Sequence, residues 1–257
     1  MSLHHEDVPP SSDAGFATWL AGKAGELLVE LRRELGFGDP RALRDAGDRR
    51  SHELLVESFA KWRPDDAVLS EEGRDDPVRL TADRVWIVDP LDGTREYGEP
   101  GRTDWAVHVA LWTRDLGLTG GAVALPAQNV VLGTERPAPP VSVPVRRIRI
   151  VTSRTRPPEF LAGVAAALDA ELVPMGSAGA KVAAVVQGTV DAYVHAGGQY
   201  EWDSAAPVAV ALATGHYASR LDGSILEYNR PDPLLPDLVV SRPEIATRLV
   251  AALAEVR

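Results

Sequence analysis

The sequence predicts a mixed α and β protein made of two halves, an α+β half followed by an α/β half. Two helices with apolar residues at helical spacing come first, and short strands joined by tight Gly- or Asn-containing turns follow. Such turns are typical of a mostly antiparallel sheet. Beyond residue 145, strands and helices alternate, which is the pattern of an α/β arrangement. We therefore expect one half over residues 14–145 and the other over residues 146–257.

The first half is predicted to open with two helices. Ser12 and Asp13 are suitable caps for the first helix, which lays an apolar face on a core. The second is predicted from about Asp48 to Trp62, because Pro64 lies just beyond it and disfavours a helical residue before it. Five strands are then expected over residues 68–70, 85–89, 105–112, 122–125 and 130–133.

A proline-rich stretch separates the two halves. Four prolines between Arg136 and Val145 predict a linker. After it, the expected strands cover residues 147–152, 171–173, 190–195 and 237–241, and the expected helices cover residues 158–168, 178–187, 203–213 and the chain from residue 243 onward. The polar residues 1–13, which include His4 and His5, are expected to form a disordered tail and not a signal peptide.

Composition limits the classes of function. The net charge is −10, so binding to a nucleic acid polymer through its phosphates is not expected. The absence of cysteine excludes disulfides, thiolate zinc sites and cysteine nucleophiles, and no apolar run is long enough to span a membrane. We expect a cytoplasmic protein that binds a small anionic molecule with the help of cations that reverse the local charge.

The most informative segment is residues 86–94, with the sequence WIVDPLDGT. A hydrophobic strand leads to Asp89, and a proline and a glycine force a turn that holds Asp92 three residues later. Two fixed carboxylates, with the carbonyl of Leu91 between them, supply the hard oxygen ligands that Mg²⁺ requires. An Asp-Gly turn alone is far more often an ordinary strand end, so the prediction depends on the whole nine-residue string.

Two further acidic positions gain meaning from this segment. Glu71 follows another predicted strand, and Asp203 opens a predicted helix. Taken alone, the first is usually a solvated charge and the second is usually a helix cap. Together with Asp89 and Asp92 they complete a set of metal ligands.

These motifs, in this order, resemble the inositol monophosphatase superfamily. The string of residues 86–94, the Ser-Glu-Glu upstream of it and the Trp-Asp-x-Ala-Ala downstream are most similar to the CysQ-type 3′(2′),5′-bisphosphate nucleotidases of actinobacteria. The resemblance extends from about residue 14 to the end of the chain. It implies a layered αβαβα sandwich with metals at the junction of the two halves.

The resemblance also implies roles for single residues. The positions that correspond to the family's ligands for two or three Mg²⁺ ions are Glu71, Asp89, the carbonyl of Leu91, Asp92 and Asp203. Thr94 and Asp48, with Glu71, correspond to the residues that activate the attacking water, although from the sequence itself Asp48 is only a helix N-cap. The backbone N–H groups of Gly93 and Thr94 are placed to receive a phosphate.

Water is the expected nucleophile. A phosphate ester and several carboxylates repel each other, and metal ions resolve this conflict while lowering the pKa of a bound water. An aspartyl nucleophile requires an Asp-x-Asp pattern, whereas two residues separate Asp89 from Asp92. Positioning and electrostatics are then the main sources of catalysis.

Weaker features bear on the substrate. Ser177 and Lys181 lie at the start of a predicted helix, where small residues and a cation suit a phosphate. His195 stands where inositol phosphatases typically place a glutamate, and Tyr228 ends a segment similar to a turn of the nucleotidases, with Ile225 in place of a proline. Each of these also has an ordinary structural explanation, as a helix start, a strand end or a hairpin.

Arginines supply the remaining candidates. Arg102 and Asp104 follow the turn of residues 89–94 and could flank the pocket. Arg102 could take a second phosphate by a bidentate contact, and a surface salt bridge is at least as good an explanation. Arg220 is similarly ambiguous between a substrate contact and a surface ion pair.

We expect 3′-phosphoadenosine 5′-phosphate as the substrate, hydrolysed to AMP and phosphate in sulfate assimilation. Inositol-1-phosphate and fructose-1,6-bisphosphate are the alternatives, and a non-catalytic metal-dependent nucleotide sensor is the alternative of another class. The resemblance further implies inhibition by lithium, competition by calcium and the possibility of a homodimer.

Overall fold

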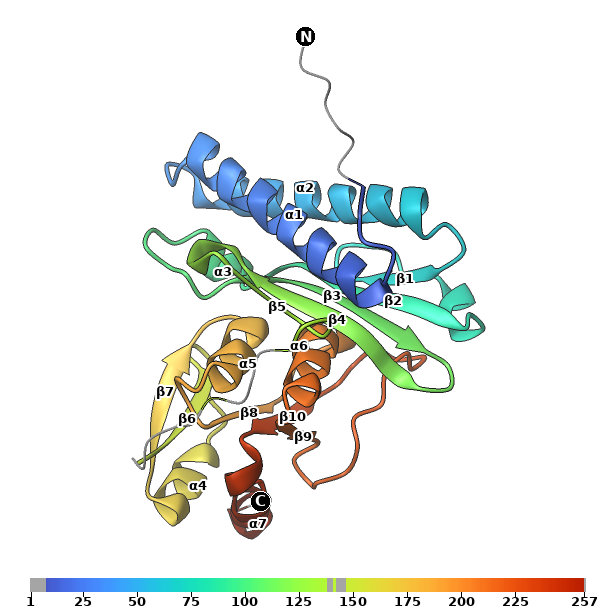
Figure 1. The fold of residues 1–257 in the computed structure, drawn as a ribbon. Coiled ribbons are helices and arrows are strands. Elements are labelled where there is room, and N and C mark those ends of the chain that lie inside the picture. Colours follow the sequence, from blue (N-terminus) through green and yellow to red (C-terminus); the bar gives the residue numbers. More distant parts are fainter. Residues whose placement is uncertain (1–7, 138–140, 142–146, 257) are drawn as a thin grey trace.

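The computed structural model describes residues 8–137, 141 and 147–256 of the chain (Figure 1). The predicted tail with His4 and His5 lies largely outside the described residues, and so does the predicted joint near residue 145. Within the described part, none of the helices combines the length and the hydrophobicity that crossing a bilayer requires.

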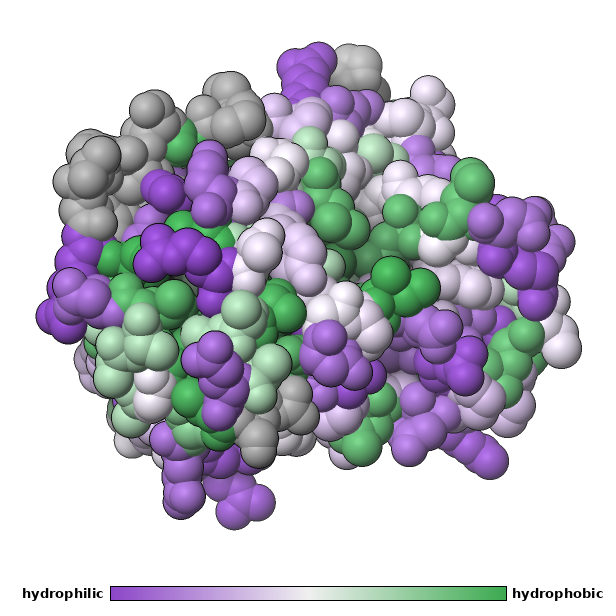
Figure 2. Space-filling view, turned by 90° about the horizontal axis from the view of Figure 1, so that it is seen from below, coloured by the Kyte–Doolittle hydropathy of each residue, from purple (hydrophilic) through white to green (hydrophobic). Residues whose placement is uncertain are grey.

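Five layers stack in the order helices, sheet, helices, sheet, helices, as the resemblance implies (Figure 1). The outer pair on one side is α1 (Asp13–Leu35) and α2 (Pro40–Trp62), and the outer pair on the other side is α4 (Leu161–Leu168) and α7 (Pro243–Val256). The central layer is formed by α5 (Ala178–Val186) and α6 (Glu201–Ala213), which lie between the two sheets. Figure 2 looks at the molecule from the side of α4 and α7, where apolar and polar residues are interspersed.

The first sheet is mostly antiparallel, as predicted. Its strands follow the chain in the order β1 (Ala67–Ser70), β2 (Arg84–Asp92), β3 (Ala106–Thr113), β4 (Gly117–Leu125) and β5 (Val130–Gly133). Only the pair β1 and β2 is parallel. Short helices connect some of these elements, namely η1 (Pro77–Leu80), α3 (Thr94–Tyr97) and η2 (Pro126–Gln128).

The second sheet has the α/β character predicted for the second half. Its order is β7 (Ala170–Met175), β6 (Ile148–Ser153), β8 (Ala192–Ala196), β10 (Asp237–Ser241) and β9 (Tyr217–Ser219). The first three strands are parallel to one another, and β10 is antiparallel to both of its neighbours. The sequence analysis missed β9, which is only three residues long.

The predicted start of the second helix is wrong by about two turns. The helix begins at Pro40, because the Asp39 side chain caps it by accepting from the N–H groups of residues 41 and 42, and proline is favourable at a first helical position. The helix contains Gly47, where a Cβ would come within 2.8 Å of the Tyr97 ring. The close packing of Tyr97 explains why a glycine occupies this helical position. Asp48 is therefore an interior helical residue and not an N-cap.

Strand β2 is buried on both faces, which fixes the backbone that carries the main motif. Trp86 and Val88 pack toward α1 and α2, whereas Val85 and Ile87 pack toward α5 and α6. The strand continues through Asp92, further than predicted, with a register shift between its two aspartates. Such an irregularity re-aims side chains at the end of a strand.

Candidate active site

Three carboxylates from two distant segments converge in the molecule. Asp89 and Asp92 lie at the end of β2, and Asp203 lies in the first turn of α6. Each offers an oxygen within 4.8 Å of the others. Asp203 is at the third position of its helix, where its Oδ2 accepts the N–H of Tyr200 at 2.7 Å, so it completes a capping box and is not the N-cap that the sequence suggested.

The local backbone holds this cluster in place. Asp89 Oδ1 accepts the N–H of Leu91 at 2.9 Å, and the hydroxyl of Ser51 on α2 donates to the carbonyl of Pro90 at 2.7 Å. Gly93 follows with a φ of 85°, which a glycine adopts without strain. The turn that presents the two aspartates is thus tied both to itself and to a helix.

The remaining predicted ligand, Glu71, follows β1 and is close enough to Asp89 to interact with it directly. Burial and the charges of neighbouring carboxylates raise the pKa of Glu71 to about 7, although its contact with Asp89 opposes the shift. The pKa of Asp203 is also raised to about 7, by burial and then by Asp92, and burial raises the pKa of Asp89 well above its usual range. These raised pKa values indicate that the three carboxylates repel one another and have no positive charge close enough to offset that repulsion.

A divalent cation with hard oxygen ligands fits this donor set. Carboxylate and carbonyl oxygens are the ligands of Mg²⁺, and a bound ion would relieve the mutual repulsion of Glu71, Asp89 and Asp203. The carbonyl of Leu91 accepts the hydroxyl of Thr94 at 3.0 Å, so that this predicted ligand already has one partner.

Asp92 is held differently from the other three acids. Its Oδ2 accepts the Ser177 hydroxyl at 2.5 Å and the Gly179 N–H at 2.6 Å, and it lies 3.2 Å from Nε2 of His108. Burial raises the pKa of Asp92, but the His108 charge and these donors prevail and lower it to about 2. All three contacts fall on one oxygen, which leaves Oδ1 for a ligand.

The residues predicted to activate water are also brought together. The hydroxyl of Thr94 lies 3.2 Å from Oδ1 of Asp48 and 3.0 Å from the carbonyl of Leu91. Burial and then the charge of Glu72 raise the pKa of Asp48 to about 7. Asp48 and Ser51 both lie on α2, and through them this helix contacts the turn of residues 89–94, which we call the metal turn.

A cavity of about 300 Å³ opens beside the acidic cluster. The predicted residues Gly93, Thr94, Ser177, Lys181 and His195 line it. It is bounded on one side by Asp92 and Asp203 and on another by the segment 153–156 after β6. Among the described residues, one larger cavity lies between α1 and α2, and another lies between the β3–β4 turn, α6 and residues 218–230. Neither carries such an acidic cluster within the described part of the chain.

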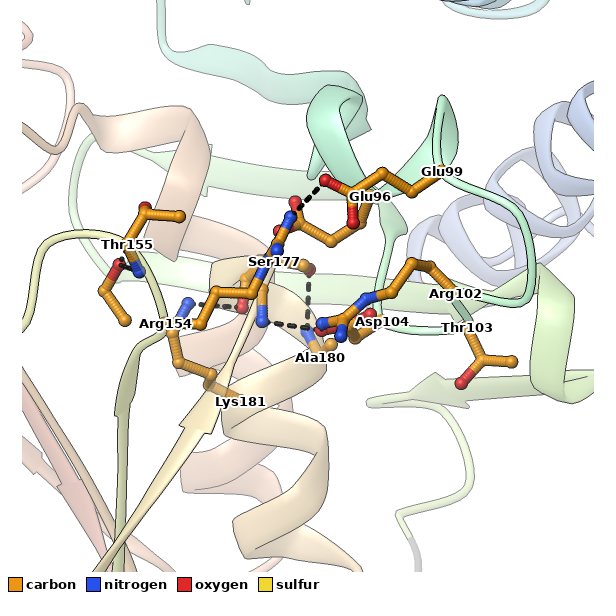
Figure 3. Close-up of polar contacts among 12 residues, drawn as sticks. Glu96, Glu99, Arg102, Thr103, Asp104, Arg154, Thr155, Ser177, Ala180 and Lys181 are labelled. Carbon is orange, nitrogen blue, oxygen red and sulfur yellow. Dashed lines mark hydrogen bonds and ion pairs between the residues drawn. The ribbon is translucent and has the colours of Figure 1, made fainter. Parts of the chain in front are cut away.

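The predicted cation Lys181 is buried beside this cavity. Its Nζ donates to the carbonyl of Ser177 at 2.7 Å and lies 5.1 Å from the centre of the Tyr193 ring (Figure 3). Burial lowers its pKa, although Asp92 and other acids oppose that shift. Burial and the charge of Lys181 likewise lower the pKa of His195 to about 4, so this imidazole is neutral at pH 7.

Two arginines after β6 differ in their pairing. Arg154 donates to Glu96 at 2.5 Å and to Glu99 at 2.6 Å (Figure 3). Arg156 lines the cavity, and among the residues that the structure describes its guanidinium has no hydrogen bond or ion pair. Arg95, next to the metal turn, is exposed, and its guanidinium also has no hydrogen bond or ion pair among the described residues.

The other predicted contacts are not brought to the cavity wall. Arg102 pairs with Asp104, which also accepts the N–H of Gly176 at 2.6 Å, so this pair supports the backbone before α5 (Figure 3). Tyr228 is buried, its hydroxyl lies 3.2 Å from that of Ser204, and it borders a different cavity.

Arg220 forms the ion pair that the sequence left as one explanation. It donates to both carboxylate oxygens of Asp237, at 2.8 and 2.6 Å.

The sequence analysis missed His108 and the segment 153–156. The segment had a usable signal, because it follows a predicted strand whose carboxyl end belongs to a parallel sheet, where ligands commonly bind. His108 lies inside an apolar strand and had none.

Comparisons with known proteins agree with this geometry. A profile of the inositol monophosphatase family matches residues 17–257. The chain is 55% identical over 256 residues to the 3′-phosphoadenosine 5′-phosphate phosphatase of Mycobacterium leprae (strain TN), covering 95% of this chain and 94% of that relative. It is 32% identical over 206 residues to the 3′(2′),5′-bisphosphate nucleotidase CysQ of Escherichia coli (strain K12), covering 74% and 81%.

Solved structures share the fold. Inositol monophosphatase-II from Staphylococcus aureus MSSA476 superposes with a TM-score of 0.78 at 22% identity, over 92% of this chain and 93% of that one. Mycobacterium tuberculosis SuhB gives a TM-score of 0.74 at 25% identity, over 98% and 99%. The layered sandwich predicted from the sequence is confirmed.

Proposed function

The chain belongs to the inositol monophosphatase family, and from this premise we propose that it hydrolyses the 3′-phosphate of 3′-phosphoadenosine 5′-phosphate. The products are AMP and inorganic phosphate, and the reaction belongs to sulfate assimilation. The observation that carries the proposal is the mixed lining of one cavity, which joins the crowded carboxylates Asp92 and Asp203, its acidic end, to His195 and Arg156, its basic end, with Lys181 within electrostatic reach of both. A substrate with two phosphates suits both ends.

The acidic end is the proposed site of two or three Mg²⁺ ions. The residues that would hold them are Glu71, Asp89, Asp92, Asp203 and the carbonyl of Leu91. When bound, such ions lower the pKa of a coordinated water and stabilise the charge on the phosphate and leaving-group oxygens. The raised pKa values of Glu71 and Asp203 support the need for a cation at this end.

The chain's own residues supply the proton handling. The hydroxyl of Thr94 lies between Asp48 Oδ1 and the Leu91 carbonyl, so it can accept a hydrogen bond from the attacking water and relay its proton toward Asp48. No side chain is needed as a nucleophile, which agrees with the absence of cysteine and of an Asp-x-Asp pattern.

The basic end is the proposed site of the second phosphate. Arg102, the residue favoured by the sequence, already pairs with Asp104. Arg156 is a better candidate because its guanidinium lines the cavity without a carboxylate partner among the described residues. His195 lies within electrostatic reach of both Arg156 and Lys181, and its Nε2 has no partner in the described part of the chain.

The activity for which a similar protein is named supports the same substrate. At 55% identity across nearly the whole of both chains, the Mycobacterium leprae 3′-phosphoadenosine 5′-phosphate phosphatase shares this length and family. Inositol-1-phosphate is a weaker candidate, because His195 lines the cavity where inositol phosphatases typically place a glutamate that binds a ring hydroxyl. Fructose-1,6-bisphosphate is the other alternative.

The test is phosphate release with Mg²⁺, measured side by side on 3′-phosphoadenosine 5′-phosphate, inositol-1-phosphate and fructose-1,6-bisphosphate. We expect a kcat/KM at least about tenfold higher for the nucleotide, and loss of activity on chelation. Equal rates on all three substrates would defeat the nucleotide assignment and leave a general phosphatase. No release from any of them would favour a metal-dependent sensor.

A further inference from the structure

His108 occupies a central position that the proposed mechanism does not explain. It lies in β3, opposite Asp89 in the strand ladder, and its side chain is completely buried. Its ring reaches toward two other elements, the metal turn at the end of β2 and the first turn of α6. Burying a polar imidazole in an apolar strand costs free energy, so a histidine at this position needs an explanation beyond filling the core.

The two ring nitrogens face the two segments that carry metal ligands. Nε2 lies 3.2 Å from Oδ2 of Asp92. Nδ1 lies 3.0 Å from the carbonyl of Trp202, which accepts its hydrogen and directly precedes Asp203. One side chain therefore connects Asp92 and the backbone of Asp203, which are far apart in the sequence.

Gly179 gives an independent sign that this ring position is specific. A Cβ on Gly179 would lie 2.1 Å from His108 Nε2 and 3.0 Å from its Cδ2, closer than real side chains approach. Glycine inside a helix is less stable than alanine, so its presence there calls for a reason. The imidazole of His108 occupies the space that a side chain at position 179 would need, which explains a glycine inside α5. The N–H of Gly179 also donates to Asp92 at 2.6 Å.

We infer that His108 is a positioning residue that holds Asp92 and Asp203 in the arrangement that binds the divalent cation, and that Gly179 is a glycine to admit its ring. This rests on the proposed function, since it presupposes a metal at the acidic end. The contacts act on Oδ2 of Asp92 and leave Oδ1 free for the ion. Residues of this kind, hydrogen-bonded to metal ligands, typically change metal affinity or activity by about 10- to 100-fold when they are replaced.

Asparagine and glutamine separate the two contacts of the ring. The amide nitrogen of His108→Asn can take the place of Nδ1, so this variant keeps the contact with Trp202 and loses the one with Asp92. His108→Gln can place its amide nitrogen near Nε2, so it keeps Asp92 and loses Trp202. If His108 had only a structural role, the two replacements should affect Mg²⁺ binding equally.

The experiment is titration of Mg²⁺ into the metal-free full-length protein by calorimetry, with Tm recorded without metal. We expect His108→Asn to weaken Mg²⁺ binding by about 10- to 100-fold and His108→Gln to restore most of it. His216→Asn, which lies beyond the carboxyl end of α6 and just before β9, is the matched control and should bind Mg²⁺ like the wild type. A lower Tm with unchanged Mg²⁺ affinity in His108→Asn would overturn the inference.

Gly179→Ala tests the steric part. Alone it should weaken Mg²⁺ binding, because the methyl group displaces the ring from Asp92. In the His108→Asn background its additional effect should be several-fold smaller, because the shorter side chain has vacated that space. An equal penalty in both backgrounds would show that Gly179 acts without His108.

Measurements on the wild type distinguish failure of the inference about His108 from failure of the proposed function. If it binds Mg²⁺ but does not turn over 3′-phosphoadenosine 5′-phosphate, the proposed function fails and the His108 comparison still decides the inference. If it binds no Mg²⁺, both are overturned.

Discussion

Two groups of acidic residues lie around the same cavity, and they are treated in opposite ways. Glu96 and Glu99 are paired with Arg154, and Asp104 is paired with Arg102 (Figure 3). In the cluster of acids proposed to bind metal, Glu71, Asp89 and Asp203 are influenced mainly by burial and by neighbouring acids. Asp92 alone of these four has His108 and Ser177 as partners.

The pKa values express this difference. Those of Glu71 and Asp203 are raised to about 7, by burial first and by neighbouring acids next. The acids that stabilise the fold at this place have an arginine beside them, whereas Glu71, Asp89 and Asp203 have none and their pKa values are raised. Asp92 is the exception, because His108 and its hydrogen-bond donors lower its pKa. The comparison therefore separates function from folding among carboxylates a few residues apart.

The largest effect is expected from removing a charge from the acidic cluster. Asp92→Asn keeps an oxygen that can accept from Ser177 and Gly179, so the turn should persist. It removes a proposed metal ligand, and metal stabilisation of the transition state is worth several kcal/mol, so kcat/KM should fall by at least about 10³-fold. Phosphate release and a melting curve check this. An active Asp92→Asn enzyme would contradict the metal assignment.

The next prediction concerns the free guanidinium at the opposite end. Arg156→Gln removes the proposed partner of the second phosphate. A charged hydrogen bond is worth about 1.5–3 kcal/mol, so kcat/KM for 3′-phosphoadenosine 5′-phosphate should fall by about 10- to 100-fold. For 3′-AMP, which lacks the 5′-phosphate, the change should be small.

Arg95→Gln is the matched comparison, because Arg95 is also unpaired among the described residues but adjoins the metal turn. If Arg95→Gln discriminates between the two nucleotides and Arg156→Gln does not, the second phosphate lies elsewhere. An equal loss on both nucleotides in Arg156→Gln would indicate contact with the base or the ribose.

Much of this site could be predicted from short-range patterns. The carboxylates of residues 86–94, the strand before them and the glycine turn are local features, and the structure brings Asp89 and Asp92 together with Asp203. Glu71 joins them because β1 runs parallel to β2, so that both strands end at the same edge. The fold class followed from the change in rhythm after residue 145.

What could not be predicted depended on long-range packing. The early start of α2 was hidden by Gly47, which normally argues against a helix but here makes room for Tyr97. His108 looks like any residue of an apolar strand until α5 and α6 are placed against it. Arg102 and Arg156 are indistinguishable in the sequence, and only the position of Asp104 shows which one is already paired.

The paired group should respond to substitution in stability and not in catalysis. Glu99→Gln removes one of the two acids that hold Arg154, and its side chain is 40% exposed, so the expected loss of stability is under about 1 kcal/mol. Glu96 keeps the arginine in place, and kcat/KM should stay within about threefold of the wild type. Chemical denaturation and phosphate release measure the two effects. A large loss of activity would place Arg154 in the reaction and blur the distinction between the two groups.

The smallest effect is expected at Tyr228. The sequence predicted that this residue contacts the substrate, and the geometry does not favour that role. Its hydroxyl lies 3.2 Å from that of Ser204 inside the core, so Tyr228→Phe should lose one hydrogen bond, worth about 1 kcal/mol, and keep the ring in place. The KM for 3′-phosphoadenosine 5′-phosphate should stay within about twofold of the wild-type value, because the ring borders a cavity other than the one beside the carboxylates. A clear rise in KM with unchanged Tm would show that the chain around Tyr228 moves toward the active site when the nucleotide binds.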